Sequence, residues 1–245
     1  MKMKGTMLPA SIDLRPIFAR YNLPNRRQGA RGTCSVFTVV GGLEYAMAVH
    51  EGQGTRLSIE FLNWASHKAA SRTADGGFFS ELWTGYETSG ICLEEDLPYL
   101  SEYNVGLEPA EQLIQTAKQL CSDNLELTWI KEWDPNTGLS ADELTAIQAA
   151  ISSGWPVLGG FRWPKKARWQ DGVLDMCIPE DVYDGHSVLL TGYTRDPAQP
   201  GGGQFLIRNS GGDGSDGYLT YAYAAEYMND AAWIGCVGGA PRIIH

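Results

Sequence analysis

The chain is poor in basic residues. Its 245 residues include 19 Lys and Arg against 29 Asp and Glu, which gives a formal net charge of −10 at pH 7. Because phosphate binding needs clustered Lys and Arg, this balance argues against nucleic acid as a partner. An acidic protein attracts cationic substrates at low salt, although the simpler interpretation is that the charge keeps the chain soluble.

Long apolar runs are also missing. The longest nearly uncharged apolar stretch, residues 34–43, contains Ser, Thr and two Gly and is shorter than a membrane-spanning helix. Residues 1–7 carry two lysines without the apolar core of a signal peptide. We therefore expect no membrane association. Two origins stay open: a complete cytoplasmic protein, or the mature fragment of a precursor from a secreted or lysosome-like compartment.

Cysteine is scarce, and none of it forms a C-x-x-C pair. This excludes zinc sites of the usual spacing, and we expect no metal and no other cofactor. An odd number leaves at least one thiol unpaired within a monomer, and the pairing of the others cannot be read from the sequence. The five cysteines are Cys34, Cys92, Cys121, Cys177 and Cys236.

The first half of the chain is helical in character. An amphipathic run from Thr33 to Gly52 predicts a buried helix of about four turns. A second helix is predicted over residues 57–66, with Ser58 as its cap. A third is predicted over residues 140–153, where Ser140 and Glu143 match a capping box.

After Gly154 the pattern changes to strands. Apolar or alternating runs over 155–161, 187–193, 204–208 and 218–223 are separated by glycine-rich turns, and the GGG at 201–203 is read as a hairpin loop. These patterns predict an α+β fold with a mainly helical lobe over residues 1–122 and a β-rich lobe over 123–245.

Three segments carry a candidate active site. The stretch QGARGTC runs from Gln28 to Cys34, DGHSVLLTGY surrounds His186, and FLIRNSGG surrounds Asn209. Cysteine, histidine and asparagine can act as nucleophile, general base and orienting residue. A cysteine at a helix N-terminus also meets unpaired N–H groups and the positive end of the helix dipole, which favour the thiolate.

The order of these segments resembles the papain-like cysteine peptidase family over nearly the whole chain. LPASIDLRP at 8–16 and LSIEFLNWAS at 57–66 fit that family, as do GGFFSELW, GICLEEDLPY, GWPVLGGF and GYLTY in sequence order. The resemblance implies a two-lobed fold, a helical lobe plus an antiparallel β-barrel-like lobe, with the active site in the cleft between them.

The resemblance also assigns roles. It implies that Cys34 is the nucleophile, that His186 forms a thiolate–imidazolium pair with it, and that Asn209 orients the imidazole. Gln28 and the backbone N–H of Cys34 would stabilise the oxyanion. The implied function is hydrolysis of peptide bonds through a thioester acyl-enzyme.

The substrate-binding residues follow from the same resemblance. Gly76 and Gly77 would pair with the backbone of a peptide or protein substrate. The pocket for the second residue before the cut would be lined by Phe78, Phe79, Gly160 and Ser187. The two phenylalanines suggest an apolar preference there.

Several residues depart from the family pattern. Arg31 replaces a family cysteine, so that disulfide cannot form, and Ser35 replaces an aromatic. Cys236 matches a family half-cystine, with Cys177 as its implied partner. Gly211 replaces a family tryptophan that shields the Asn–His hydrogen bond from water. Two alternatives follow: the bond is more open to water here, or another aromatic such as Trp163 covers it.

Regulation and turnover leave alternatives open. Seven residues precede Leu8, so control by a removed or separate propeptide, or by a proteinaceous inhibitor, is expected in place of a propeptide in this chain. A thiol amidase or acyltransferase acting on a specific amide is one alternative function. A binding module that kept the fold and lost turnover is the other.

Overall fold

The structure is a computed structural model that describes residues 8–122, 124–212 and 214–236. The helices are α1 (Arg15–Arg20), α2 (Cys34–Glu51), α3 (Ile59–Ala70), α4 (Phe79–Ser89), α5 (Glu111–Gln119), α6 (Ala141–Ser152), α7 (Tyr221–Tyr227) and the short 3-10 helix η1 (Pro179–Asp181). The strands are β1 (Ser11–Asp13), β2 (Leu125–Lys131), β3 (Val157–Pro164), β4 (Trp169–Gln170), β5 (Val173–Leu174), β6 (Val182–Arg195), β7 (Gly203–Arg208), β8 (Asp216–Thr220) and β9 (Met228–Cys236).

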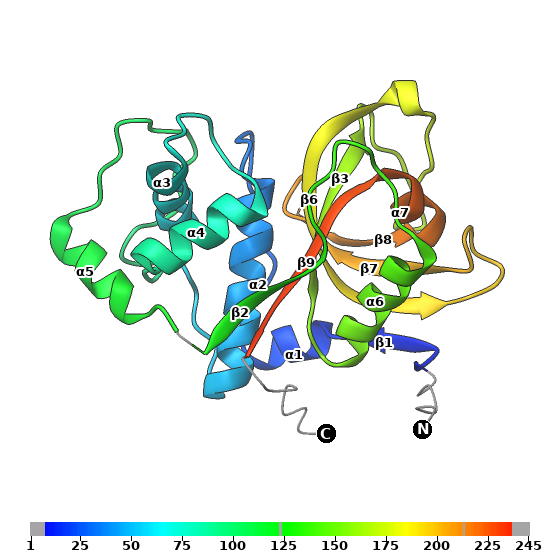
Figure 1. The fold of residues 1–245 in the computed structure, drawn as a ribbon, viewed down its shortest axis with the longest axis horizontal. Coiled ribbons are helices and arrows are strands. Elements are labelled where there is room, and N and C mark those ends of the chain that lie inside the picture. The colour runs from blue at the N-terminus through cyan, green and yellow to red at the C-terminus, as the bar shows by residue number, and fades with distance from the viewer. Residues whose placement is uncertain (1–7, 123, 213, 237–245) are drawn as a thin grey trace.

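The elements form two groups, as Figure 1 shows. Helices α3, α4 and α5 lie on one side, the large sheet lies on the other, and α2 runs between them. Helix α2 packs against α3 and α4 as well as against β3, β6 and β9. The predicted α+β class is therefore confirmed, and the first residue of α2, Cys34, lies where the two groups meet.

The sheet is mostly antiparallel and is not closed. Its strand order is β2-β9-β3-β6-β7-β8-β5-β4, with β1 added on β6 and with β5 and β8 parallel. No pairing among the described residues joins the outer strands β2 and β4. The predicted antiparallel, barrel-like lobe is therefore a sheet that stays open between β2 and β4. One physical reason is that β4 and β5 have two residues each, too few to extend a hydrogen-bonded ladder around the sheet.

Helix α2 confirms the predicted helix but not its amphipathic character. It ends at Gly52, a left-handed cap with φ of 75°, and it is buried on nearly every face. Gly41 and Gly42 face the Leu189 and Leu158 side chains of the sheet, so closely that a side chain at Gly42 would press against Leu158. This close approach fixes the height of Cys34 above the sheet.

The other predicted helices are confirmed with small changes at their ends. The Ser58 side chain caps α3 by accepting from Phe61 N at 2.9 Å, and the helix continues to Ala70. Ser140 and Glu143 form the predicted capping box of α6. The strand predicted over 218–223 is wrong beyond residue 220, because the Thr220 hydroxyl caps α7 and turns the chain into a helix.

The predicted division of the chain after residue 122 stays a prediction. Residue 123 lies outside the described residues, as do residues 1–7 and 237–245 of the two predicted lobes. Strand β1, from the predicted helical half, pairs with β6 of the sheet. The N-terminal segment therefore lies on the β-rich side, as Figure 1 shows.

The implied disulfide between Cys177 and Cys236 is wrong. All five cysteines are free thiols. The Cys177 carbonyl accepts from the Tyr227 hydroxyl at 2.7 Å, which places it beside the start of β9, whereas Cys236 ends this nine-residue strand. An extended strand of that length separates the two by roughly 25 Å, far beyond disulfide reach.

In the described part of the chain, no helix combines the length and apolarity needed to cross a membrane.

Candidate active site

Cys34 is the first residue of α2, and its side chain is buried. The preceding Thr33 caps the helix with no side-chain hydrogen bond, since its hydroxyl bonds to Tyr99 OH at 2.7 Å instead. The N–H groups of the first turn therefore stay free of a capping side chain, and the positive end of the helix dipole lies at the thiol. Cys34 Sγ donates to the carbonyl of Gly185 at 3.7 Å, the residue before His186.

His186 and Asn209 come from neighbouring strands of the sheet. His186 lies on β6 and Asn209 follows the last residue of β7, which pairs with β6. The Asn209 Oδ1 atom accepts from Gly211 N and lies 2.9 Å from His186 Nε2. Because that oxygen is an acceptor, Nε2 carries the proton, and Nδ1 is the ring nitrogen left for the thiol.

Burial opposes charge on both reactive groups. Burial raises the pKa of the Cys34 thiol, whereas hydrogen bonds from Ser187 and from the Ser35 backbone act in the opposite direction. Burial lowers the pKa of His186, and the hydrogen bond with Asn209 partly compensates. The site therefore favours a pair whose charges form together, because the two together stay neutral.

An aromatic ring covers the histidine despite Gly211. The Trp163 ring on β3 lies 4.5 Å from the His186 ring, centroid to centroid, and Trp163 is buried. A Cβ atom at Gly211 would lie 3.2 Å from His186 Cε1 and 3.3 Å from Asn209 Oδ1. A larger side chain at Gly211 would therefore press on the hydrogen-bonded pair, and the cover comes from Trp163 instead.

Gln28 is fixed from both sides of the site. Its Nε2 donates to the Arg31 carbonyl at 2.8 Å, and its Oε1 accepts from the Ser210 hydroxyl at 2.9 Å. Its backbone N–H also donates to the Ser210 carbonyl. A primary amide has two N–H donors, so one remains for an oxyanion.

Cys34 and His186 border one cavity of about 340 Å³ between the two groups of elements. Of the residues expected to bind substrate, Gly77, Phe78, Phe79, Gly160 and Ser187 line this cavity. Phe78 is 43% exposed, whereas Phe79 is 2% exposed and packs into the core. The sequence-based site therefore assembles around one opening.

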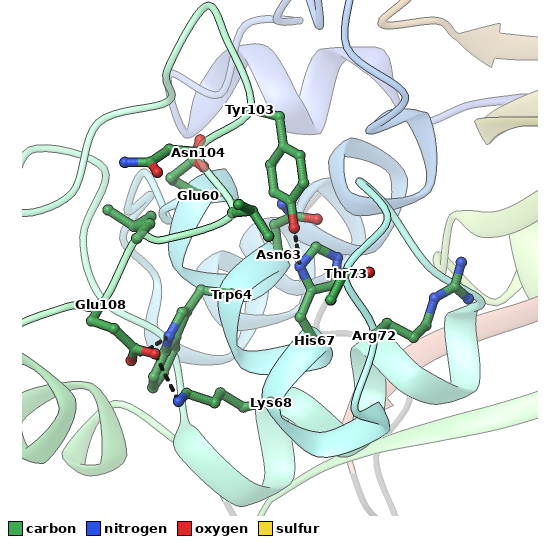
Figure 2. A pocket seen from close by; sticks show the side chains of 12 residues that line it. Glu60, Asn63, Trp64, His67, Lys68, Arg72, Thr73, Tyr103, Asn104 and Glu108 are labelled. Carbon is green, nitrogen blue, oxygen red and sulfur yellow. Dashed lines mark hydrogen bonds and ion pairs between the residues drawn. The ribbon is translucent and has the colours of Figure 1, made fainter.

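Gly76 differs from the other expected substrate residues because it does not line that cavity. Its N–H donates to Asn63 Oδ1 at 3.0 Å, and its carbonyl lies 3.1 Å from His67 Nε2. Figure 2 shows His67 and Asn63 in a second, smaller pocket of α3, with the Tyr103 hydroxyl bonded to His67 Nδ1. Gly76 thus anchors the loop, and its neighbour Gly77 faces the cavity.

Arg31 joins that loop to the segment before the nucleophile. All five of its N–H groups are used: they donate to Glu60, to Asp75 and to the Leu100 carbonyl at 2.6–3.2 Å. Although burial acts against the charge, the hydrogen bonds to Asp75 and Glu60 raise the pKa of Arg31. An ion-paired guanidinium thus holds the position where the family resemblance expects a disulfide.

Trp133, Asn229 and Asp230 line the cavity although the sequence analysis gave them no role. Trp133, after β2, packs against Phe78 at 5.2 Å between ring centroids. Asn229 and Asp230 come from β9, whose residues are buried on both faces and so lack the alternation that marks a strand. The only local signal for Asp230 is an acidic residue directly before the apolar run at 231–234, which the sequence-based prediction did not use.

No group of three or more His, Cys, Asp or Glu side chains in the described ranges could hold a metal ion. A cysteine at a helix N-terminus, facing a histidine held by an asparagine across an interlobe cavity, is typical of hydrolases with a thiol nucleophile.

Comparison with known proteins gives the family. The sequence profile for "Papain family cysteine protease" matches residues 8–233, and the chain belongs to this family, whose members are hydrolases. The sequence is 28% identical over 203 residues to cysteine proteinase B of Leishmania mexicana. That alignment covers 80% of this chain and 41% of the relative, so the chain spans less than half of that protein.

Solved structures confirm the papain-like fold. Xylellain, a cysteine protease from Xylella fastidiosa, superposes with a TM-score of 0.71 and 20% identity, covering 94% of this chain and 87% of xylellain. The Amb a 11 cysteine protease, a ragweed pollen allergen solved in its proform, gives a TM-score of 0.66 at 20% identity and covers 95% of this chain and 68% of that one.

Proposed function

We propose that this chain hydrolyses peptide bonds through a Cys34–His186–Asn209 triad. The observation that carries the proposal is the placement of His186, which Asn209 holds through Nε2 while it borders the same cavity as Cys34. With Nε2 engaged, Nδ1 can exchange a proton with the thiol. Asn209 fixes the tautomer that this exchange requires.

The reaction proceeds in two acyl transfers. The Cys34 thiolate attacks the carbonyl carbon of the substrate, and the oxyanion that forms accepts hydrogen bonds from Gln28 Nε2 and the Cys34 backbone N–H. His186 gives its proton to the leaving amine as the C–N bond breaks, which leaves a thioester. His186 then takes a proton from water, and the hydroxide attacks the thioester carbonyl. The C–S bond breaks, the acid leaves, and the proton returns from His186 to the Cys34 sulfur.

The electrostatics of the site support a thiolate in spite of its burial. The dipole of the 18-residue helix α2 and the Ser35 and Ser187 hydrogen bonds stabilise negative charge on Sγ. Proton transfer to His186 creates an imidazolium beside the thiolate, so both charges are compensated where they form. We propose a peptide or protein as the substrate, bound with its backbone beside Gly77.

The test compares the wild-type chain with Cys34→Ala on an unfolded polypeptide, with acid-quenched intact mass to detect a thioester. Wild type should cleave the polypeptide and carry an acyl group on Cys34. The alanine variant should do neither. Cys177→Ala is the matched control, since Cys177 lies outside the site. Cleavage by Cys34→Ala would refute the mechanism.

Two other outcomes would replace the proposal. An acyl group transferred to Cys34 from small amides, with no polypeptide cleaved, identifies an amidase or acyltransferase. Polypeptide binding without any acylation of Cys34 identifies a binding module.

A further inference from the structure

A buried carboxylate borders the proposed substrate cavity. Asp230 on β9 is 4% exposed and lines the cavity together with Cys34, Phe78 and His186. Its backbone stands opposite Gly160 of β3 in the antiparallel register, and the pairing shifts between Gly160 and Phe161. Gly160 is one of the residues expected to line the pocket for the second residue before the cut.

The absence of a side chain at Gly160 makes room for this carboxylate. A Cβ atom built on Gly160 would overlap Oδ1 of Asp230. The carboxylate therefore fills the space above Gly160, on the face of the strand that borders the cavity. The Gly160 backbone N–H hydrogen-bonds to it.

No cation neutralises Asp230 within the described part of the chain. It forms none of the ion pairs there, and Lys131 of β2 acts on it through space alone. Arg72, across the cavity, is bonded to Glu81 at 2.7 Å. The other titratable groups on the cavity, Cys34 and His186, serve the reaction. A buried carboxylate without a paired cation is costly, and a cation brought by a ligand relieves that cost.

The rest of the pocket suits a long basic side chain. The Phe78 and Trp133 rings pack edge to face, and Arg72 lies over the Phe78 ring at 5.5 Å while it is paired with Glu81. The Trp133 side of this apolar surface is where the methylene stem of Lys or Arg can lie. Phe79 is buried in the core, so the apolar preference suggested by two adjacent phenylalanines rests on Phe78 alone. A net charge of −10 attracts cationic substrates to the cleft.

We propose that Asp230 makes this site select a basic residue, Lys or Arg, as the second residue before the cut. The inference rests on the proposed peptidase function and names its substrate class. It replaces the apolar preference expected from the sequence.

The preference should depend on pH. Burial raises the pKa of Asp230 to about 7, although the Gly160 N–H and Lys131 act in the opposite direction. The carboxyl is therefore charged above neutral pH and becomes neutral as the medium turns acid. Selection for a basic side chain should strengthen from about pH 5.5 to about pH 8.

The test uses three fluorogenic substrates that differ at the second residue before the cut: arginine, its uncharged isostere citrulline, and leucine. At about pH 8 the wild-type kcat/KM for arginine should exceed that for citrulline by about tenfold or more. Asp230→Asn, which keeps the shape, should bring the ratio close to one. Gly160→Ala, which displaces the carboxylate, should lower it independently.

The outcomes separate this inference from the proposed function. Cleavage of leucine in preference to arginine at both pH values, or an arginine-to-citrulline ratio that neither variant changes, would overturn the role of Asp230 while leaving a working peptidase. If none of the three substrates is cleaved and Cys34 is never acylated, the proposed function fails as well.

Discussion

The two walls of the cleft bury polar chemistry in different ways. On the helical side, Arg31 is held by Glu60 and Asp75, and all three side chains are at most 14% exposed. On the sheet side, the Trp163 ring covers His186. The centroid of the Trp163 ring lies 6.2–6.4 Å from the ring centroids of Phe161 and Tyr223. One wall depends on paired charges and the other on the shapes of rings.

The difference follows from the backbone. The segments around Arg31 and Asp75 are loops without a ladder, so side-chain charges supply the hydrogen bonds that hold them. Strands β3 and β6 satisfy their own backbone groups, and their faces are free to pack apolar rings. Asp230 is the exception on the sheet side, a buried charge without a partner. This contrast predicts different responses to substitution and pH.

The largest stability effect is expected at Arg31. Arg31→Met leaves Glu60 and Asp75 buried without a cation, which should cost about 3–5 kcal/mol of unfolding free energy. The loosened Gly76–Gly77 loop should also raise KM. Denaturant unfolding and steady-state kinetics measure the two effects.

A surface pair provides the matched control for Arg31. Arg15 and Asp13 are bonded at 2.7 Å but are 37% and 39% exposed. Arg15→Met should cost no more than about 1 kcal/mol. Equal losses in both variants would show that the helical wall does not depend on its buried charges.

The unpaired charge on the sheet side should make stability depend on pH. The folded pKa of Asp230, about 7, lies above the ordinary value of 3.8, so folding favours the protonated form. Its contribution to stability is complete below about pH 4 and is lost as the pH rises through 7. The loss totals ~4 kcal/mol at most.

Asp230→Asn should remove this pH dependence. Relative to wild type, the variant should gain free energy of unfolding at about pH 8 and gain far less at about pH 5. Urea unfolding at the two pH values measures the difference. A constant offset between the two proteins would mean that Asp230 does not titrate in this range.

A smaller effect is expected when the ring over His186 is reduced. Trp163→Phe should cost about 1–2 kcal/mol in stability. It should also raise the pKa of His186 by letting water nearer the imidazole. The matched control is Trp169→Phe, because Trp169 lies beside Trp163 but is 38% exposed. NMR titration of His186 checks the account, and an unmoved pKa in Trp163→Phe would count against it.

The smallest effect is expected at Gly211. The Cβ atom of Gly211→Ala would press on His186 and Asn209 by a few tenths of an ångström. We expect a loss of about 1 kcal/mol or less in stability and a several-fold lower kcat/KM. A gain in kcat/KM would show that Trp163 leaves the pair incompletely covered.

The sequence predicted the segments whose patterns are local. The capping residues Ser58 and Ser140 and the glycine at position 52 marked helix ends that the structure places at or near the predicted positions. The strands with alternating or apolar runs, β3, β6 and β7, were found for the same reason. Helix α4 was read as a loop because of its glycines. Strand β9 is buried on both faces and gave no clear periodic signal.

The site was predicted only where residue identity carries the chemistry. Cys34, His186, Asn209 and Gln28 were recognisable by type and order, and the structure brings them together. The partners of Arg31 and the strand register that places Asp230 opposite Gly160 could not be recognised from the sequence. Both depend on contacts between residues distant in the chain. The absence of the implied disulfide depends on the same long-range geometry.

The central claim is that Cys34 and His186 form a reactive ion pair, and alkylation tests it most directly. Wild type and His186→Ala are treated with iodoacetamide at about pH 5.5, where ordinary thiols are protonated, and labelling is mapped by peptide. We predict rapid labelling of Cys34 that is lost in the variant, with the other four cysteines slow in both proteins. Labelling of Cys34 as slow as that of the other cysteines in wild type would contradict the ion pair and the triad mechanism built on it.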